Sequence, residues 1–295
     1  MIPQSSANAR VVVGIPTRDR CDELRKAIAS AFDQSYSPLR IMVCDDASGD
    51  GTPKLRDEFK NVSWQRSEQA QGSVKARNKM MLTAVDDYYV SLDDDSWFIT
   101  GDEIAVAVDY LERHARVAAV AFDILAPDRP QPMPRGARHS VETFIGCGHI
   151  LRLSTVKALG GYAEFSGSYG SEEKDLCLRL IDAGYEIVRM VGVHVWHERT
   201  MTARDLADQH TSGVCNDLTF ALRRVPLGLL LPVLGYKLVS QIAFSVRYGL
   251  VRPCIGGIVA FARASAKTWR TRKPVRWSSF WRYQTLARAP REVAG

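Results

Sequence analysis

The chain has 295 residues, 46% of them hydrophobic, which is enough for one large core or for a domain with an appendage. Its six cysteines form no Cys-x-x-Cys pair, so metal–thiolate spacing is absent and a reduced, cytosolic setting is favoured. No apolar signal segment is found in residues 1–10. The net charge of +6 hides an asymmetry: residues 218–295 carry 14 Lys and Arg against one acid, whereas residues 1–217 carry 25 against 32. The composition therefore predicts two parts, 1–217 and 218–295.

Short apolar runs alternate with helix-like segments through the first 200 residues. This βαβ order predicts an α/β fold with a mostly parallel central sheet flanked by helices. A loop is predicted for residues 126–136, which hold four prolines. The predicted strands are 10–16, 39–44, 62–65, 88–92, 117–124 and 186–195, and the predicted helices are 22–34, a short one opening at Thr52-Pro53, 73–84, 101–114, 154–159 and 171–183.

Two acids, Asp45 and Asp46, follow the second predicted strand, and Gly49 and Gly51 come soon after. Acids at a strand end can accept hydrogen bonds from a nucleotide base or ribose, and glycines let a ligand approach the backbone. A tight polar turn explains these residues equally well. The glycine spacing of a dinucleotide fingerprint is missing, which argues against NAD.

Gly72 precedes a predicted helix that is capped by Ser73 and carries Lys75 and Arg77 in its first turns. The positive end of the helix and the two cations favour an anion. A solvated basic helix face is the competing interpretation.

Three consecutive acids, Asp93, Asp94 and Asp95, end the buried strand 88–92. Open α/β sheets bind ligands beyond the carboxyl ends of their strands. Three carboxylates there repel one another unless a cation lies between them, and oxygen ligands suit Mg²⁺ or Mn²⁺, which would also neutralise a diphosphate. A solvated acidic turn is the alternative.

Two further acids, Glu172 and Glu173, fall in the first turn of the helix 171–183. The helix dipole stabilises ionised carboxylates at this position, so either one is predicted to be charged near neutral pH. An ionised carboxylate can act as a general base toward an attacking alcohol. Acids in a first helical turn are also ordinary stabilising residues.

Two histidines lie at the end of the last predicted strand. Strand alternation places His194 and Val195 on opposite faces, so both histidines are not expected to reach one site. His197, at the strand end, is the better candidate metal ligand, and a polar boundary residue is the alternative interpretation.

Together, motifs across residues 10–200 resemble the inverting family-2 glycosyltransferases, which have the GT-A fold. The specificity of this resemblance comes from the order of the motifs along the chain. They are VVVGIPTRDR (11–20), CDDASGDGT (44–52), GSVKARN (72–78), VSLDDDSW (90–97), GCGHILRLSTVKALGGY (146–162), SEEKDLCLRLIDAGYEI (171–187) and VHVWH (193–197).

The resemblance implies a role for each motif. It implies a DxD motif formed by Asp93 and Asp95, with Asp95 closest to a Mn²⁺ or Mg²⁺ ion that His197 also approaches. It implies a general base at Glu173 or Glu172, and the choice stays open because the family usually has aspartate where Glu173 stands and glycine where Ser171 stands. It implies that Thr17, Asp45 and Asp46 contact the nucleotide. We also expect the nucleotide sugar to be bound by Arg18, Lys75, Arg77, Asp93 and Asp94.

The implied reaction is a single in-line displacement at the anomeric carbon of a UDP- or dTDP-sugar by an acceptor hydroxyl. The glutamate would deprotonate the acceptor while the cation stabilises the departing diphosphate. The loop 163–170 is expected beside the acceptor. Sugar, nucleotide and acceptor are not identified by the sequence.

The basic C-terminal part contains an apolar stretch, residues 225–244, that is long enough to span a bilayer. Its Lys237, prolines and glycines bring the insertion free energy close to zero. A polar stripe of Lys237, Ser240 and Gln241 instead favours a helix at the membrane interface, assisted by basic residues worth about 1 kcal/mol each near anionic lipid. We therefore expect a cytoplasmic enzyme on the inner face of the cell membrane, with a lipid-linked glycan or another glycoconjugate as acceptor; a soluble natural product is the alternative acceptor. Packing on the catalytic domain or in a homodimer is the main alternative, and binding of nucleic acid is not expected.

Two other functions compete with sugar transfer. A sugar nucleotidyltransferase shares the sheet and the metal-bound diphosphate, but it usually has a glycine-rich basic loop after the first strand, which residues 16–20 lack. A catalytically silent sugar-binding or scaffold protein is the second alternative, and the acids at 93–95 and 172–173 argue against it.

Overall fold

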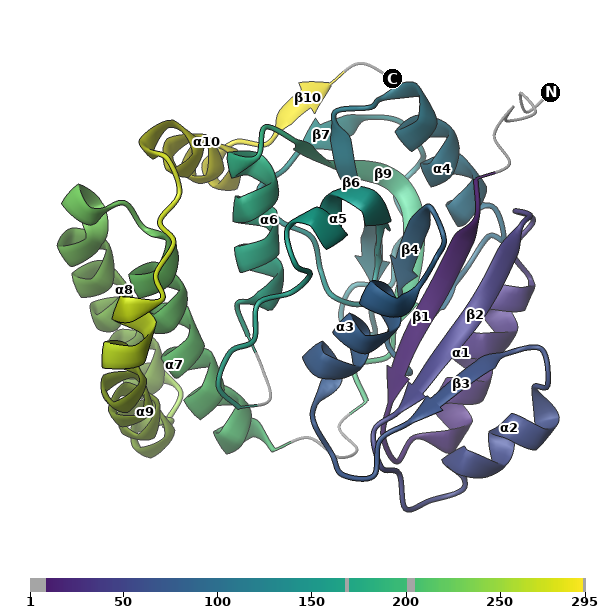
Figure 1. Ribbon diagram of the computed structural model, residues 1–295, viewed down its shortest axis with the longest axis horizontal. Coiled ribbons are helices and arrows are strands. Elements are labelled where there is room, and N and C mark those ends of the chain that lie inside the picture. The colour runs from purple at the N-terminus through teal and green to yellow at the C-terminus, as the bar shows by residue number, and fades with distance from the viewer. Residues whose placement is uncertain (1–8, 168–169, 201–204, 294–295) are drawn as a thin grey trace.

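The fold is described from a computed structural model of the chain, in which residues 9–167, 170–200 and 205–293 are described. At its centre is a ten-stranded sheet of order β10-β7-β9-β6-β8-β4-β1-β2-β3, with β5 paired to β9 (Figure 1). Most strands run in the direction of β1, as predicted, while β5, β7 and β8 run against it. The strands are β1 (Val11–Thr17), β2 (Leu39–Asp45), β3 (Ser63–Arg66), β4 (Tyr88–Ser91), β5 (Ser96–Phe98), β6 (Val117–Leu125), β7 (Arg138–Ser140), β8 (His149–Arg152), β9 (Glu186–His197) and β10 (Arg291–Val293).

Helices cover both faces of this sheet, because alternate residues of each strand point to opposite faces. In β1, for example, Val11 and Val13 pack with α1 and α4, whereas Val12 packs with α3, α5 and α6. The helices are α1 (Cys21–Phe32), the 3₁₀ turn η1 (Thr52–Lys54), α2 (Leu55–Glu58), α3 (Ser73–Thr83), α4 (Glu103–Arg113), α5 (Leu153–Ala158), α6 (Glu172–Asp182), α7 (Leu206–Arg224), α8 (Leu227–Arg247), α9 (Val251–Arg270) and α10 (Trp277–Arg288).

The C-terminal helices are packed on the part of the fold that contains the sheet. Residue 217, where the composition changes, lies inside α7, and Phe220 and Leu222 beyond it share a hydrophobic cluster with Leu176 and Leu178 of α6. A buried ion pair also joins the two parts, since Nε of Arg224 lies 2.6 Å from Oδ1 of Asp175. The charge asymmetry is therefore not accompanied by a break in the fold.

Helix α8 directs Lys237 and Gln241 of its polar stripe to the protein, whereas Ser240 and many of its apolar side chains are exposed. Lys237 Nζ lies 2.6 Å from Oδ1 of Asp217 on α7, and Gln241 donates to the other carboxylate oxygen at 3.3 Å. The outward side chains include Leu231, which is 80% exposed, and Val239, which is 66% exposed. By length and hydropathy α8 qualifies as a membrane-spanning helix, and it is the one such helix in the described part of the chain.

Candidate active site

The candidate site lies at the carboxyl ends of three neighbouring parallel strands, β2, β1 and β4. Thr17 pairs with Asp45 in the sheet, and its carbonyl accepts a hydrogen bond from the Asp46 N–H at 2.9 Å. The loop after β4 therefore brings Asp93, Asp94 and Asp95 to the same edge as the acids after β2. The topology thus assembles three of the sequence motifs at one edge.

The carboxylates of Asp45 and Asp46 shape the loops around this edge. Asp45 is buried, accepts a hydrogen bond from Ser48 N–H at 2.8 Å and forms an ion pair with Arg66 of β3. Asp46 accepts hydrogen bonds from the N–H groups of Gln71 at 2.9 Å and Gly72 at 2.8 Å. Both carboxylates therefore have hydrogen-bond or ion-pair partners within the protein, and they fix the loops that follow β2 and β3.

Asp46 therefore binds the backbone of the two residues that precede α3. The prediction that Ser73 caps this helix is wrong, because α3 begins at Ser73, the capping position is Gly72, and no side-chain capping bond is formed. Gly72 has φ of 92°, a conformation that glycine adopts at little cost, and this turns its N–H toward the carboxylate.

The second of the three aspartates points toward α1. Asp94 is buried, and its Oδ1 lies 2.8 Å from Nη1 of Arg20. The backbone N–H of Arg18 donates to its other oxygen at 3.3 Å. Burial raises the pKa of Asp94 to about 6, although Arg20 opposes this rise. Asp94 therefore fixes the loop after β1, while the Arg18 side chain itself is mostly exposed.

Asp95 and His197 meet at the centre of the site. Asp95 is fully buried, and its Oδ1 lies 3.3 Å from Nε2 of His197 at the end of β9. Its Oδ2 accepts a hydrogen bond from Thr200 N–H at 3.0 Å and lies 3.5 Å from Arg20. His194 is directed elsewhere, as predicted from strand alternation, and its Nε2 accepts a hydrogen bond from Met133 N–H at 3.1 Å.

These donors fit a divalent cation. Asp93, Cys147 and His197 each offer one ligand atom, and the three atoms lie within 4.8 Å of one another. Carboxylate oxygens suit Mn²⁺ and Mg²⁺, and imidazole is a common transition-metal ligand. The fit therefore rests on Asp93, Cys147 and His197. Asp95, the third predicted ligand, is outside this group but has Oδ1 3.3 Å from Nε2 of His197.

Arg77 connects the aspartates to the glutamate pair of α6. It is buried, forms an ion pair with Asp93, and interacts electrostatically with Glu173 and Glu172. These acids raise its pKa well above the ordinary value despite burial. The interpretation of Arg77 as part of a solvated basic helix face is wrong, because its guanidinium is buried and paired with Asp93. Lys75, in contrast, is exposed.

Gly146 provides the space in which Arg77 and Glu173 meet. A Cβ atom on this glycine would lie 2.6 Å from Oε1 of Glu173 and 3.2 Å from Nη2 of Arg77. Any side chain at 146 would therefore displace the carboxylate or the guanidinium. The two acidic clusters thus lie on the same side of the molecule, on either side of Arg77.

Glu173 has an environment that disfavours its charged form. Burial raises its pKa to about 8, the charge of Glu172 adds to this rise, and Arg77 opposes it. The prediction that this glutamate is permanently ionised is therefore wrong, because the loss of hydration outweighs the helix dipole. A carboxylate with a strongly raised pKa is typical of groups that exchange protons during catalysis.

A small cavity beside Glu172 separates the start of α3 from α7. Its volume is about 40 Å³, and its lining includes Lys75, Phe165, Gly167, Glu172 and Asn216. Asn216 holds the loop by accepting from Ser166 N–H at 3.1 Å and donating to Ser166 O at 2.8 Å. Residues 163–167 therefore lie next to the glutamate pair; residues 168–169 are outside the described part.

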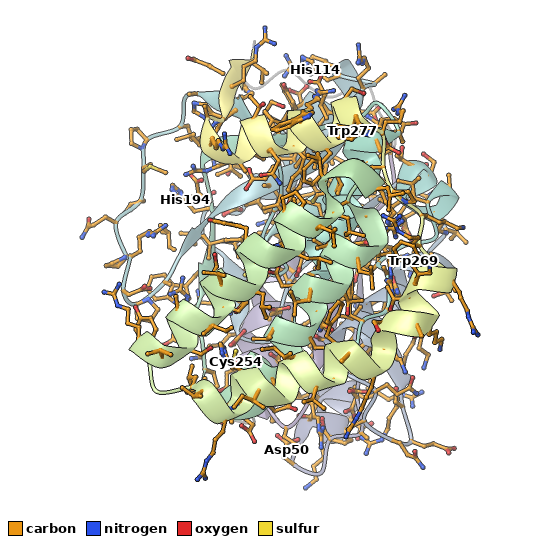
Figure 2. The ribbon with its side chains drawn as sticks, turned by 90° about the vertical axis from the view of Figure 1, so that its left-hand side faces the viewer. Asp50, His114, His194, Cys254, Trp269 and Trp277 are labelled. Atoms are coloured by element: carbon orange, nitrogen blue, oxygen red, sulfur yellow. The ribbon has the colours of Figure 1, made fainter. Side chains whose placement is uncertain are left out.

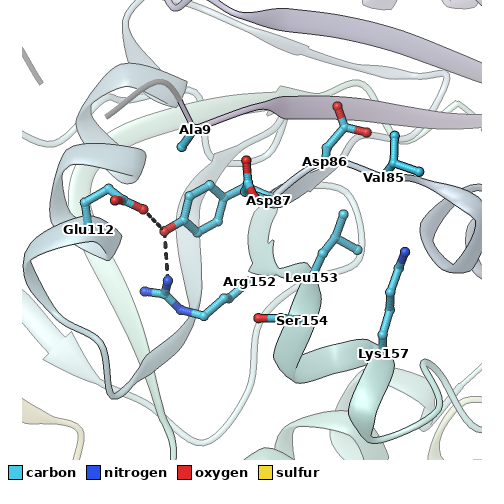
Figure 3. A pocket seen from close by; sticks show the side chains of 10 residues that line it. Ala9, Val85, Asp86, Asp87, Glu112, Arg152, Leu153, Ser154 and Lys157 are labelled. Carbon is cyan, nitrogen blue, oxygen red and sulfur yellow. Dashed lines mark hydrogen bonds between the residues drawn. The ribbon is translucent and has the colours of Figure 1, made fainter. Parts of the chain in front are cut away.

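A larger cavity, of about 500 Å³, lies at the other, amino-terminal ends of β1 and β4 (Figure 3). The charged groups that line it are paired within the protein. The Tyr88 hydroxyl donates a hydrogen bond to Glu112, and Arg152 donates one to that hydroxyl at 2.9 Å. Lys157 donates to the carbonyl of Ala84. This cavity contains none of the predicted site residues.

The sequence reasoning missed several residues of the site. Arg20, Arg66 and Thr200 contact the acids directly, and Cys147 lies among the candidate metal ligands. Arg20 and Cys147 stand in motifs that carried the family resemblance, so their position was a usable signal. Nothing in the sequence pairs Arg66 or Thr200 with a particular acid.

Comparisons with known proteins agree with this geometry. Residues 12–155 match the model of glycosyl transferase family 2, and residues 134–203 match a model described as the N-terminal domain of galactosyltransferase. The putative glycosyltransferase EpsE of Bacillus subtilis is 27% identical over 201 residues, which are 61% of this chain and 69% of EpsE.

The pre-mycofactocin glycosyltransferase of Mycobacterium tuberculosis is 24% identical over 277 residues, 85% of this chain. The match spans only 56% of that relative's length. The mannosyltransferase PcManGT of Pyrobaculum calidifontis, solved with GDP-Man and Mn²⁺, has a similar fold, with a TM-score of 0.60 and 17% identity over 96% of this chain and 87% of that one.

The sheet, the strand-end acids and the matched families together define a GT-A protein. The family-2 match covers residues 12–155, just under half of the chain, and the fold is that of the GT-A glycosyltransferases.

Proposed function

We propose that this protein is an inverting glycosyltransferase that moves a sugar from a nucleoside-diphosphate sugar to an acceptor hydroxyl. The observation that carries the proposal is the position of Arg77, which contacts Asp93 of the strand-end acids and interacts with Glu173 of α6. It keeps a candidate cation site and a candidate base together. An in-line displacement needs the leaving diphosphate and the acceptor base at the same anomeric carbon.

Glu173 is our candidate for the general base. Its raised pKa of about 8 makes it a stronger base than an ordinary carboxylate once it is ionised, and Glu172 contributes to that rise. Arg77 interacts electrostatically with this carboxylate and compensates part of its charge. Glu172 lines the neighbouring cavity, so we assign it to binding of the acceptor and to tuning Glu173.

Asp93, Asp95 and His197 would hold a divalent cation. When bound, Mn²⁺ or Mg²⁺ neutralises charge on the departing diphosphate, which is typically worth several kcal/mol. Arg20 and the Thr200 N–H hold Asp95 in position. PcManGT was solved with Mn²⁺, and the resemblance in fold makes Mn²⁺ the first ion to test.

The donor is proposed to lie across the ends of β1, β2 and β4. Among the described residues, the buried Thr17 hydroxyl has no hydrogen-bond partner, which leaves it available to a ligand. Asp45 and Asp46 fix the loops beside these strand ends. Lys75 and Arg18 are exposed cations, and we propose that they face the phosphates of the donor. We propose a UDP- or dTDP-sugar, with GDP-sugars as the outcome that would correct this choice.

The outward apolar face of α8 supports attachment to the cytoplasmic membrane surface. Because Lys237 and Gln241 bind Asp217 inside the protein, the apolar side chains are left for another apolar environment. Figure 2 shows α8 and α9 on one face, with Trp269 near one end of α9 and Cys254 near the other. Basic residues of α9 would attract anionic lipid. A lipid-linked acceptor follows naturally from this location.

Metal-dependent hydrolysis of the donor tests the proposal directly. The full-length protein is incubated with Mn²⁺ and each of a panel of UDP-, dTDP- and GDP-sugars, and release of the nucleoside diphosphate is measured. One nucleotide sugar should be hydrolysed slowly, with inversion of the released sugar, and thermal shifts should identify the same donor. Formation of a nucleotide sugar from sugar phosphate and nucleoside triphosphate would instead support a nucleotidyltransferase.

A further inference from the structure

Cys147 lies among the candidate cation ligands, although family resemblance and sequence reasoning gave it no role. It is 1% exposed, and its Sγ is within 4.8 Å of a carboxylate oxygen of Asp93 and a ring nitrogen of His197. It belongs to the short segment between Gly146, which faces Glu173, and β8. The thiol is therefore placed at the reaction centre.

The three ligand types at this position differ in the ions they prefer. Carboxylate oxygens suit Mg²⁺ and Mn²⁺, whereas thiolate sulfur favours Zn²⁺ and similar soft ions. Three protein ligands from Asp, Cys and His, together with an open fourth position, are a common arrangement for Zn²⁺. Asp95 also approaches His197, with Oδ1 3.3 Å from Nε2.

We propose that Asp93, Cys147 and His197 form a second mode of cation binding, selective for thiophilic divalent ions such as Zn²⁺ and competitive with Mn²⁺. The two modes compete because both use Asp93 and His197, while Mn²⁺ adds Asp95 and Zn²⁺ adds Cys147. On binding Zn²⁺ the thiol forms the metal–sulfur bond and releases its proton to solvent. The inference rests on the cation site of the proposed function.

The competition predicts inhibition by Zn²⁺. A Zn²⁺ ion held by sulfur has fewer positions for phosphate oxygens than an octahedral Mn²⁺ ion, so the donor diphosphate is bound less well. Transfer supported by Mn²⁺ should therefore fall as Zn²⁺ is added, and chelation of Zn²⁺ should restore it.

Cobalt spectroscopy tests the sulfur ligand without an activity assay. The metal-free, reduced full-length protein is titrated with Co²⁺, which replaces Zn²⁺ and gives a sulfur-to-cobalt charge-transfer band in the near ultraviolet. We expect this band to saturate at one equivalent, to disappear on addition of Zn²⁺, and to be absent in Cys147→Ser. The matched control is Cys254→Ser, which removes another buried thiol, in the contact between α7 and α9, and should keep the band.

Competition is measured by the electron paramagnetic resonance signal of free Mn²⁺. Zn²⁺ should release bound Mn²⁺ from the wild type, and Cys147→Ser should weaken Zn²⁺ binding by about tenfold or more while leaving Mn²⁺ binding unchanged. If Cys147→Ser does not fold, as judged by circular dichroism, Cys147→Ala and the wild-type titrations take its place.

The inference is overturned if Co²⁺ binds the wild type without the charge-transfer band, if the band survives in the Cys147 variant, or if Zn²⁺ binds without releasing Mn²⁺. These results leave Mn²⁺ binding and the proposed transferase intact. Failure of the wild type to bind Mn²⁺ would overturn both the inference and the proposed cation site.

Discussion

Oδ1 of Asp95 lies 3.3 Å from Nε2 of His197, which joins the loop after β4 to the end of β9. The pair lies at the point where β5 and β9 run antiparallel, with Ser96 opposite His197. Asp95 is fully buried, and a buried carboxylate needs a positive partner. Arg20 supplies one, and a bound cation would supply a second.

Removal of the cation should therefore stop the reaction, and Asp95→Asn should imitate that removal. We expect EDTA to abolish donor hydrolysis and Mn²⁺ to restore it. We expect Asp95→Asn to lower the rate by about 10²-fold or more, since metal stabilisation of a leaving group is worth several kcal/mol. Rates are measured with saturating donor over a range of Mn²⁺ concentrations. The control is Asp109→Asn, a partly exposed ion-pair partner of Arg113 on α4, which should leave the rate unchanged.

The glutamate pair can be separated by two isosteric substitutions. Glu173→Gln should lower the turnover number by about 10²–10⁴-fold, because general-base assistance is lost while the shape is kept. Glu172→Gln should have a smaller effect on turnover and a larger one on the KM of the acceptor, since Glu172 lines the cavity beside Phe165. Steady-state kinetics of both variants decide between the two residues. Near wild-type turnover in Glu173→Gln would remove Glu173 from the role of base.

The pH dependence follows from the raised pKa of Glu173. The base must be ionised, so turnover should increase with pH, pass its midpoint near pH 8 and then level off. Folding stability should change in the opposite direction. Because the folded-state pKa lies above the ordinary value, the protonated carboxyl contributes stability that is lost as pH rises toward 8. The melting temperature of Glu173→Gln should therefore exceed that of the wild type increasingly over this range.

The sequence contained most of the framework of the site. Periodicity located the long strands and helices, since β1, β2, β6 and β9 are apolar runs bounded by turns. Periodicity identifies strands of three or four residues poorly: β3 and β4 were predicted, but β5, β7, β8 and β10 were not. These short strands complete the sheet by tertiary pairing, and β8 places Cys147 beside Asp93.

The hydrogen-bond and ion-pair partners of the site residues were harder to predict than the helices and strands. The acids were correctly placed at one edge, but whether a carboxylate binds a ligand or another residue depends on contacts from distant parts of the chain. The Asp46 carboxylate accepts a hydrogen bond from the backbone N–H of Gly72, and Arg77 forms an ion pair with Asp93. Burial likewise reverses the expected charge of Glu173. Hydration and pairing are properties of the folded chain, so local sequence does not determine them.

Gly146 offers a test of how precisely Glu173 must be placed. Gly146→Ala introduces a methyl group 2.6 Å from Oε1 of Glu173, so this carboxylate or the Arg77 guanidinium has to move. A displacement of about 1 Å in a reacting group can cost about 10²-fold in rate, and we expect a loss of that order in turnover. Gly136→Ala is the matched control, because nothing lies within 4 Å of a Cβ there. Equal activity of the two variants would show that the space at Gly146 is not required.

The outward face of α8 is best tested by point substitution in the full chain. Deleting residues 218–295 would remove the buried Phe220 and Leu222 and cut α7, so loss of membrane binding could not be separated from unfolding. Leu231→Glu places a charge on the exposed apolar face and should not disturb the ion pair of Lys237 with Asp217. We expect it to lower the fraction of protein that sediments with vesicles containing anionic lipid.

The control is Val85→Glu. Val85 is 69% exposed and lies away from α8, so a glutamate there adds the same charge to a different part of the surface. Raising the salt concentration should weaken binding of the wild type in part, since salt screens the basic residues but not the apolar contact. Vesicle binding that is unchanged in Leu231→Glu would assign the membrane contact to another surface. The alternative is that this face binds a second copy of the chain. In that case the wild type would not bind vesicles and would elute as a dimer, whereas Leu231→Glu would elute as a monomer.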